Sequence, residues 1–305
     1  MHAIHLALDR ASRFLRGGSA KAAFAYATAF ALTFASTGGV VLLVGAARAV
    51  GQPALIEREA RRFALSASGL MTCAFIEAAV LVTVALGASR SRGATVDVLR
   101  LGASRASGLG SAATALGLVG LTAAGGAVIE LIQSHASRDY SISDTVAIAL
   151  EGATRWRLVL ALVAVGLVPA FAEEVFFRGF LQTKLVHQWG RAPAIVASAT
   201  AFGFFHFDLA QGAVGFIAGL LLGWAAERLG SIRPCIAAHA TNNALFVALA
   251  AMSPGWATSL QVQPWVLACG AVALAAAIIA LASPAALWIP SEHSSRPLSE
   301  DTRGP

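Results

Sequence analysis

Charged residues are scarce in this chain of 305 residues. Only 12% of the residues are Asp, Glu, Lys or Arg, whereas 57% are hydrophobic, and the mean hydropathy is +0.71. A soluble globular domain carries about 25% charged residues. The shortage of charge therefore excludes an ordinary soluble domain and indicates a polytopic membrane protein.

Several functional signatures are also missing. The three cysteines lie in separate apolar segments without a C-x-x-C pair, so we expect neither a zinc ribbon nor a disulfide framework. The net charge of +6 does not form a basic stripe interleaved with aromatic residues, which excludes a nucleic-acid partner. The first 21 residues contain no short apolar core with a cleavage site, so the first apolar run is predicted to be an uncleaved signal-anchor. No internal repeat is visible.

Long apolar runs are what the sequence does contain. A membrane span needs about 20 apolar residues. On this measure we predict an all-α polytopic bundle of about eight transmembrane helices, of which the fifth and sixth are short and form a tight hairpin. The predicted spans are Ala22–Val50, Ala64–Gly87, Leu109–Ile132, Trp156–Phe177, Pro193–Phe207, Gly212–Glu227, Pro234–Met252 and Trp265–Leu287.

The polar segments suggest how the chain is divided. Ser89–Ser107 has the composition of a surface linker, and Ser141–Arg157 is interpreted as an interfacial helix. Ser291–Pro305 is polar and without periodicity, which is typical of disorder. We predict four parts: N-terminal transmembrane helices (1–140), a functional core (141–252), a final transmembrane helix (253–290) and a disordered tail (291–305).

Basic residues in short loops predict the orientation. Lys184 and Arg191 follow the fourth span, and Arg228 and Arg233 follow the sixth, whereas the loops after the fifth and seventh spans carry no Lys or Arg. By the positive-inside rule, both termini are expected in the cytoplasm and the protein in the inner membrane. Arg58, Arg61 and Arg62 fall on the predicted outer side, so the C-terminal half decides this prediction. Tryptophans near the span ends are interpreted as an interfacial belt: Trp156, Trp189, Trp256, Trp265 and Trp288.

Three ionisable residues interrupt the fourth span. Glu174 and Arg178 are four residues apart, so they share a helix face and can pair, while Glu173 is rotated by about 100°. Ionisable side chains are costly in a membrane and indicate a functional interior. An ion-pair clasp between helices would explain Glu174 and Arg178, but it would leave Glu173 unexplained. Glu173 would instead be desolvated and suited to act as a general base.

Two further polar motifs follow in apolar surroundings. His206 ends Phe202-Gly-Phe-Phe-His206, where a packed histidine is the alternative to a functional one. His239 and Asn243 share one helix face and do not belong in lipid, so we expect them to face the bundle interior. Glu77 is interpreted as a packed, hydrogen-bonded acid, with a second functional carboxylate as the alternative. Gly215, Gly219 and Gly223 are predicted to permit close helix packing.

The ordered motifs Glu173-Glu174-x-x-x-Arg178, Phe202-x-x-x-His206 and His239-x-x-x-Asn243 resemble those of the CAAX prenyl protease type II family, also called the CPBP or ABI family of intramembrane proteases. The resemblance covers about residues 141–252. It implies hydrolysis of a peptide bond near the membrane, in a protein or lipidated-peptide substrate, with membrane lipids as the surroundings.

The resemblance also implies a role for each motif residue. Glu173 and His206 would polarise the attacking water, Glu174 and Arg178 would support them, and His239 and Asn243 would stabilise the oxyanion. Zinc held by Glu173, His206 and His239 is possible, because zinc favours three protein ligands and a water. The absence of an H-E-x-x-H motif gives the metal no support. A reaction without an obligatory metal is therefore slightly favoured.

Two other classes of function are also consistent with the sequence. A non-catalytic membrane scaffold, including a bacteriocin-immunity or partner-binding protein, would not need Glu173. A transporter or channel would also carry intramembrane acids, but no repeat pairs the two halves of the chain. Retention of all six motif residues favours the protease.

Overall fold

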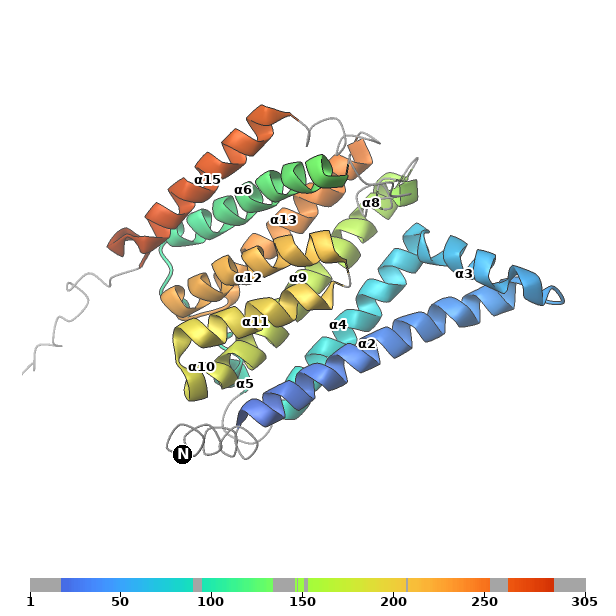
Figure 1. The fold of residues 1–305 in the computed structure, drawn as a ribbon, viewed down its shortest axis with the longest axis horizontal. Coiled ribbons are helices and arrows are strands. Elements are labelled where there is room, and N and C mark those ends of the chain that lie inside the picture. The colour runs from blue at the N-terminus through green and yellow to red at the C-terminus, as the bar shows by residue number, and fades with distance from the viewer. Residues whose placement is uncertain are drawn as a thin grey trace, which may run out of the picture.

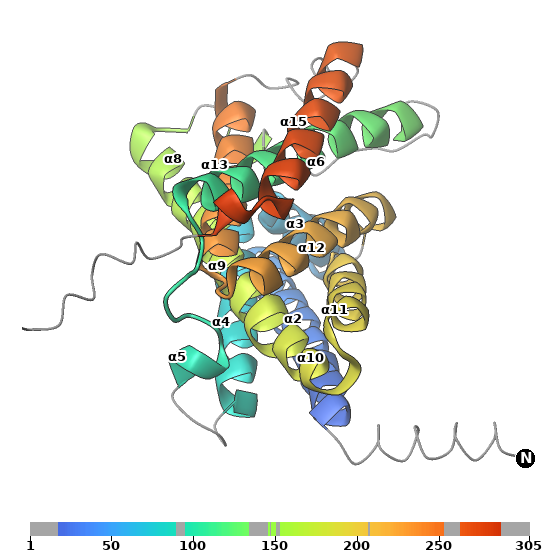
Figure 2. The same cartoon turned by 90° about the vertical axis from the view of Figure 1, so that its left-hand side faces the viewer.

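The computed structural model describes residues 18–89, 95–133, 146, 148–150, 153–206, 208–252 and 263–287. The fold is an all-α bundle, as the sequence predicts, and no β-strand is present in these ranges apart from an isolated bridge between Ala106 and Leu287. Figure 1 shows helices that run roughly alongside one another, and Figure 2 shows the same bundle from its left-hand side.

The N-terminal part contains three long helices, α2, α4 and α6. Their bounds, with those of the shorter elements between them, are α2 Gly18–Arg48, η1 Pro53–Leu55, α3 Ile56–Ala64, α4 Ala67–Ser89, α5 Thr95–Val98 and α6 Gly108–Gln133.

The C-terminal part begins with one unbroken helical run and continues with separate helices. The run consists of α8 Arg155–Ala161, η2 Leu162–Leu167, α9 Val168–Glu173, η3 Glu174–Gln182 and α10 Thr183–Trp189. It is followed by α11 Arg191–Phe205, α12 Leu209–Leu229, α13 Arg233–Met252, α15 Pro264–Ala282 and η4 Pro284–Ala286.

Within the described residues, seven of these helices are long and apolar enough to cross a membrane. The exception among the eight predicted spans is α11, which has 15 residues and is therefore only about 22 Å long. The prediction that the sixth span is short was wrong, because the corresponding helix, α12, extends over 21 residues. Together these helices make the chain a multi-pass membrane protein.

Two segments of the long run, η2 and η3, have the wider turn of a π-helix. Pro169 follows η2 and has no backbone N–H to donate to the preceding turn, which accounts for the first widening. In η3, side-chain hydroxyls bind carbonyls of the helix: Ser198 Oγ donates to Phe177 O at 2.9 Å, and Thr183 Oγ1 donates to Arg178 O at 3.1 Å. π-Turns are rare and are frequent at functional sites.

Small residues allow the helices to approach closely. A Cβ placed on Gly219 of α12 would lie 2.8 Å from Ala199 Cα of α11, and one on Gly223 would lie 2.7 Å from Gln182 Oε1. A Cβ on Gly215 would lie 3.3 Å from the His206 ring. The predicted packing role of these three glycines is confirmed. In the N-terminal part, α2 packs on α4, and α4 packs on α9.

Residues 95–107 are not the surface linker expected from their composition. Leu99 is 1% exposed, and Arg100 donates hydrogen bonds to the Glu227 carboxylate and to Ala226 O. Arg105 N donates to Leu229 O at 2.9 Å. The segment was misread because these contacts join it to the end of α12, more than 100 residues further along the chain.

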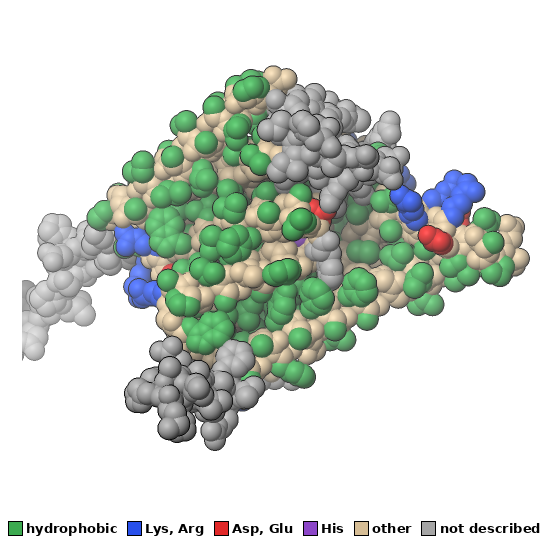
Figure 3. All heavy atoms as spheres, in the orientation of Figure 1, with side chains coloured by type: hydrophobic (Ala, Val, Ile, Leu, Met, Phe, Trp, Pro, Cys, Tyr) green, Lys and Arg blue, Asp and Glu red, His purple; other side chains and the backbone are tan. Residues whose placement is uncertain are grey.

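The side chains on the outside agree with a membrane setting. Apolar side chains cover most of the face in Figure 3, and charged ones gather at its left edge and at its right-hand end. Trp156, Trp189 and Trp265 are 64%, 40% and 57% exposed and lie near helix ends, as an interfacial belt requires. Trp256, Trp288 and the predicted tail lie outside the described residues, as do residues 141–145, 147, 151 and 152 of the predicted interfacial helix.

Some predicted loop residues lie in helices. Lys184 belongs to α10, because the helical run continues past Phe177 to Trp189, and Arg191 is the first residue of α11. Arg228 lies in the last turn of α12, and Arg233 begins α13. The turns between these helices are therefore shorter than the sequence suggested, although the basic residues still lie beside them.

Candidate active site

The predicted ion pair in the fourth span is present and fully buried. Arg178 Nη1 lies 2.9 Å from Glu174 Oε1, and both side chains are 0% exposed. The guanidinium also packs over the Phe202 ring, with Cζ 4.3 Å from the ring centroid. Arg178 Nε and Nη2 have no hydrogen-bond partner. The cation is therefore held by one carboxylate and by the rings of Phe202 and, at 6.0 Å from the centroid, Phe177.

His239 connects α13 to both glutamates. Its Nδ1 donates to Glu174 Oε1 at 2.9 Å, and its Nε2 lies 3.8 Å from Glu173 Oε2. The residue is 8% exposed, as is Glu173. Glu174 Oε1 thus accepts hydrogen bonds from both Arg178 and His239. This shared contact orients the imidazole so that Nε2 faces Glu173.

His206 lies at the end of α11, where the helix terminates. Its Nδ1 lies 2.9 Å from Phe202 O, one turn earlier in the same helix. Because a carbonyl oxygen only accepts, Nδ1 must carry the hydrogen. In the neutral ring, Nε2 is then left with a lone pair that can accept a hydrogen bond from water.

A cavity of about 460 Å³ joins Glu173 and His206. Both of these residues line it, together with residues from the N-terminal helices and Phe205 of α11. Those N-terminal residues are Thr33, Phe34, Thr37, Gly38 and Val41 of α2, and Cys73 and Glu77 of α4. Two buried atoms of its lining residues, Glu173 Oε2 and Thr33 Oγ1, have no hydrogen-bond partner.

The structure gives no contact between Asn243 and the carboxyl groups of Glu173 or Glu174 among the described residues. Asn243 is half-buried, its Oδ1 accepts a weak hydrogen bond of 3.4 Å from Asn242 Nδ2, and it is not among the described residues that line the cavity. Asn242, in turn, accepts a hydrogen bond of 2.6 Å from Thr122 of α6. The structure therefore joins Glu173, Glu174, Arg178 and His239 by contact and His206 through the cavity, and leaves Asn243 one turn of α13 away from His239.

The three candidate zinc ligands do not form a metal site in this arrangement. Among the described residues, no three His, Cys, Asp or Glu side chains come close enough together to hold a metal ion. Glu173 Oε2 and His239 Nε2 are near each other, but His206 reaches the same region only across the cavity. The geometry thus does not support the zinc set Glu173, His206 and His239.

Sequence reasoning missed the part played by the N-terminal helices. Glu77 of α4 lines the same cavity as Glu173, and Thr33 of α2 contributes a buried hydroxyl to its lining. The sequence did contain a signal for Glu77, because an isolated acid in an apolar span indicates a functional interior. A threonine in such a span carries no signal, because its hydroxyl usually bonds to its own helix.

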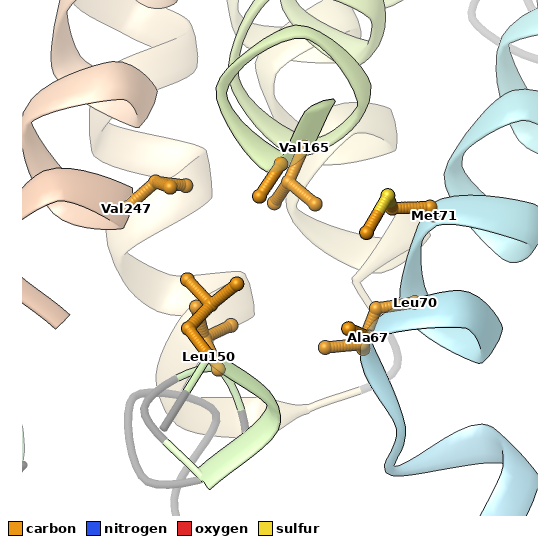
Figure 4. A pocket seen from close by; sticks show the side chains of 8 residues that line it. Ala67, Leu70, Met71, Leu150, Val165 and Val247 are labelled. Atoms are coloured by element: carbon orange, nitrogen blue, oxygen red, sulfur yellow. The ribbon is translucent and has the colours of Figure 1, made fainter. Parts of the chain in front are cut away.

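A second, much smaller pocket of about 10 Å³ lies elsewhere (Figure 4). Its lining is entirely apolar: Ala67, Leu70, Met71, Val146, Leu150, Ala161, Val165 and Val247. It contains no group that could activate water or bind a polar ligand. It is a packing gap.

The fold and the buried cluster together define a multi-pass helical membrane protein with an internal site of glutamates and histidines. Residues 155–245 match the family model described as type II CAAX prenyl endopeptidase Rce1-like. The resemblance found in the motifs is confirmed over this segment, which contains all six motif residues. At the level of the family, the match supports an intramembrane protease of the CAAX type. Comparisons with curated proteins and with solved structures gave no match.

Proposed function

We propose that the protein is an intramembrane endopeptidase that hydrolyses a peptide bond of a membrane-associated protein or lipidated peptide. The observation that carries this proposal is the cavity that Glu173 and His206 both line. Glu173 has a buried oxygen, Oε2, without a hydrogen-bond partner. A carboxylate and a neutral imidazole on one small cavity are the groups that general-base activation of water needs.

In the proposed reaction, a water is held between Glu173 and the Nε2 lone pair of His206. Glu173 takes a proton from the water as its oxygen bonds to the carbonyl carbon of the substrate. The electron pair of the C=O bond moves onto the carbonyl oxygen. When the tetrahedral intermediate collapses, the C–N bond breaks, and the proton held by Glu173 passes to the leaving nitrogen.

His239 and Asn243 are proposed to stabilise the oxyanion. Donors held in place before the reaction can contribute about 3–4 kcal/mol to such an intermediate. The hydrogen bond from His239 Nδ1 to Glu174 fixes the ring with Nε2 on the side of Glu173, and Nε2 donates to the oxyanion when the ring is doubly protonated. Asn243 would join His239 by a change of side-chain rotamer, since the two residues lie one turn apart on α13.

The Glu174–Arg178 pair is proposed to position this machinery without touching the substrate. Both side chains are inaccessible, and Glu174 contacts His239 directly. The pair therefore resembles the outer contacts that orient reacting groups in other active sites.

The cavity also suggests how the substrate is held. Phe34, Val41 and Phe205 give it an apolar side, which suits a lipid-modified segment, and the unpartnered Thr33 hydroxyl can donate to a substrate carbonyl. A volume of about 460 Å³ accommodates a few residues of extended peptide.

The test compares wild-type protein with Glu173→Ala in detergent or proteoliposomes. A fluorogenic lipidated peptide is the substrate, and mass spectrometry locates the cut. We expect cleavage by the wild type and a loss of at least about 10²-fold in kcat for the variant, which is the typical lower contribution of a general base. Glu57→Ala is the matched control, because Glu57 is an exposed glutamate on α3; it should cleave like the wild type.

The same assay with a strong zinc chelator tests the chemistry. Because the proposed steps use only protein groups, the rate should survive chelation. Loss of cleavage on chelation, with recovery on adding zinc, would contradict the metal-independent route. Equal cleavage by the wild type and Glu173→Ala would contradict the protease mechanism. Absence of cleavage, together with an unchanged membrane proteome between the two, would favour the scaffold.

A further inference from the structure

The chain between α5 and α6 packs against η3, although it lies outside the segment that matches the family model. We call residues 99–105 the strap. Leu99 is 1% exposed and belongs to the hydrophobic core. A Cβ on Gly179 of η3 would lie 2.7 Å from Leu99 O and 3.3 Å from Ile232 Cδ1, so η3 approaches the strap as closely as a glycine allows. The strap therefore contacts η3 one residue beyond Arg178 of the buried ion pair.

The strap is also bound to the start of α13. Arg100 O accepts hydrogen bonds from Ile232 N at 3.1 Å and from Ser231 Oγ at 3.2 Å, and these two residues immediately precede α13. His239 lies about two turns further along α13, and Glu174 lies about one turn before the contact of η3 with the strap. The strap thus joins the two helical segments whose side chains meet in the Glu174–His239 hydrogen bond.

The side chain of Arg100 anchors the strap to two helices at once. It donates hydrogen bonds to the Glu227 carboxylate and to Ala226 O of α12. The same carboxylate accepts a hydrogen bond of 2.9 Å from Gln182 Nε2 at the end of η3. Gln182 is 0% exposed, and the side chain of Glu227 is 10% exposed. A guanidinium of the strap, a carboxylate of α12 and an amide of η3 therefore form one largely buried hydrogen-bonded cluster.

The backbone of Arg100 is strained. Its φ is 57°, and among the described residues it is the one non-glycine residue with a positive φ. This left-handed region is uncommon for a residue with a Cβ. Strained residues persist where surrounding contacts impose them, and they cluster at functional sites. At Arg100 these contacts are on both sides, because α13 binds its carbonyl oxygen and α12 binds its side chain.

We propose that Arg100 is a positioning residue: the strap that it anchors fixes η3 relative to α13 and so maintains the contact of Glu174 with His239. None of the described residues that line the cavity belongs to the strap, so Arg100 acts through these two side chains and does not touch the substrate. This inference rests on the proposed function, because it assigns the strap a part in the same reaction.

The test replaces Arg100 within the strap. Asparagine is tolerated in the left-handed region but is too short to reach Glu227, so Arg100→Asn removes the side-chain contacts without imposing a new backbone conformation. We expect kcat to fall about tenfold with KM unchanged, because reacting groups tolerate little displacement. Arg100→Lys keeps a cation for Glu227 but lacks the forked guanidinium that also reaches Ala226 O, so kcat should return to within about threefold of the wild type.

A second variant and a control complete the set. Glu227→Gln weakens the same pair from α12 while keeping an acceptor, so kcat should fall by a smaller factor, about threefold. Arg105→Met is the matched control within the strap and should retain the wild-type kcat. Arg105 is exposed, and its hydrogen bond to Leu229 O comes from its backbone N, which the substitution keeps.

A double variant distinguishes positioning from a purely structural role. In a His239→Ala background, Arg100→Asn should have little further effect on kcat, because the contact that the strap positions is already gone. A loss of the same factor in both backgrounds would overturn the proposal. Wild-type kcat in both Arg100→Asn and Glu227→Gln would overturn it as well.

Cys235 provides a readout that needs no substrate. It lies near the start of α13 and is 0% exposed. With Cys73 and Cys269 replaced by alanine, a small permeant maleimide should label Cys235 slowly in the folded wild type. Labelling should be at least about tenfold faster in Arg100→Asn, because a loosened strap lets the start of α13 open locally. Arg105→Met should be labelled like the wild type.

The labelling separates this inference from the protease mechanism. Faster labelling of Arg100→Asn, in a protein whose wild type cleaves nothing, would contradict the proposed function and support the contact between the strap and α13. Equal labelling of the wild type and Arg100→Asn would overturn the proposal, whatever the cleavage assay gives.

Discussion

At the scale of single residues, the buried guanidinium of Arg178 is the most demanding feature of the site. It has no exposed surface, one carboxylate partner and two neighbouring aromatic rings. A buried cation with its counter-charge is a weak source of net stability, because desolvation offsets the attraction. Removing only one partner is different, because it leaves an unpaired charge in the interior.

We therefore predict that Arg178→Met destabilises the protein by about 3–5 kcal/mol, since Glu174 is left buried without its cation. The double variant Glu174→Gln/Arg178→Met should recover much of this loss. Free energies of unfolding in detergent check both expectations. Arg62→Met is the matched control: Arg62 pairs with Glu59 at 3.1 Å, but its side chain is 63% exposed, so the change should be about 0–1 kcal/mol. A double variant no more stable than Arg178→Met would contradict the electrostatic explanation.

At the scale of helices, α12 sets the position of His206 through a glycine. A Cβ on Gly215 would lie 3.3 Å from both Cε1 and Nδ1 of the His206 ring, so the ring would have to move by a few tenths of an ångström. The ring is held by its hydrogen bond to Phe202 O, and it packs edge-on against Phe202 at 4.9 Å between centroids. Such a shift would act on the proposed water-binding atom rather than on the fold.

We predict that Gly215→Ala lowers kcat by about tenfold, because reacting groups tolerate little displacement. The unfolding temperature should change little, since alanine is also the better helix former. Measuring kcat and unfolding together distinguishes the two effects. Gly39→Ala on α2 is the control, because no atom other than the neighbouring backbone of its own helix lies within 4 Å of the added methyl group. Equal kcat in Gly215→Ala and the wild type would show that the position of His206 is not critical.

The sequence predicted the helices of this bundle well, because apolar runs of membrane length have few alternatives to a helix. It also placed Glu174 and Arg178 together, although the turn between them is a π-turn rather than the α-turn assumed. The contact of Arg100 with Glu227 and the cavity that Glu77 shares with Glu173 were not foreseen. Each joins helices that lie far apart in the chain, and no spacing rule relates such positions.

At the scale of the whole molecule, contacts bring the two ends of the described chain to one face. Ser19 N of α2 donates to Gln188 Oε1 of α10 at 2.7 Å, and Arg228 at the end of α12 donates to the carbonyl of Ala282, the last residue of α15. Figure 1 shows the start of α2 and the end of α15 toward the same side of the bundle. The chain therefore passes through the bundle an even number of times. This holds only when the short helix α11 is counted as one pass together with the seven long helices.

This shared face also carries the basic residues of the tight turns in the C-terminal part, Lys184, Arg191, Arg228 and Arg233. The structure adds Arg100 and Arg105 to it, through their contacts with the end of α12. Because basic residues near short loops are retained on the cytoplasmic side, we predict that this face, with both chain ends, is cytoplasmic. The opposite face would then carry α3, with Arg58 exposed.

Cysteine labelling in cells tests this orientation. In a background with Cys73, Cys235 and Cys269 replaced by alanine, Arg58→Cys should react with a membrane-impermeant maleimide in intact cells. Arg191→Cys should react only after the membrane is permeabilised, because its position is predicted on the cytoplasmic side, where the residue is 78% exposed. The reverse labelling pattern would mean that the protein has the opposite orientation in the membrane. Labelling of both variants in intact cells would mean that α11 and α3 share one face, contrary to the alternation of the helices.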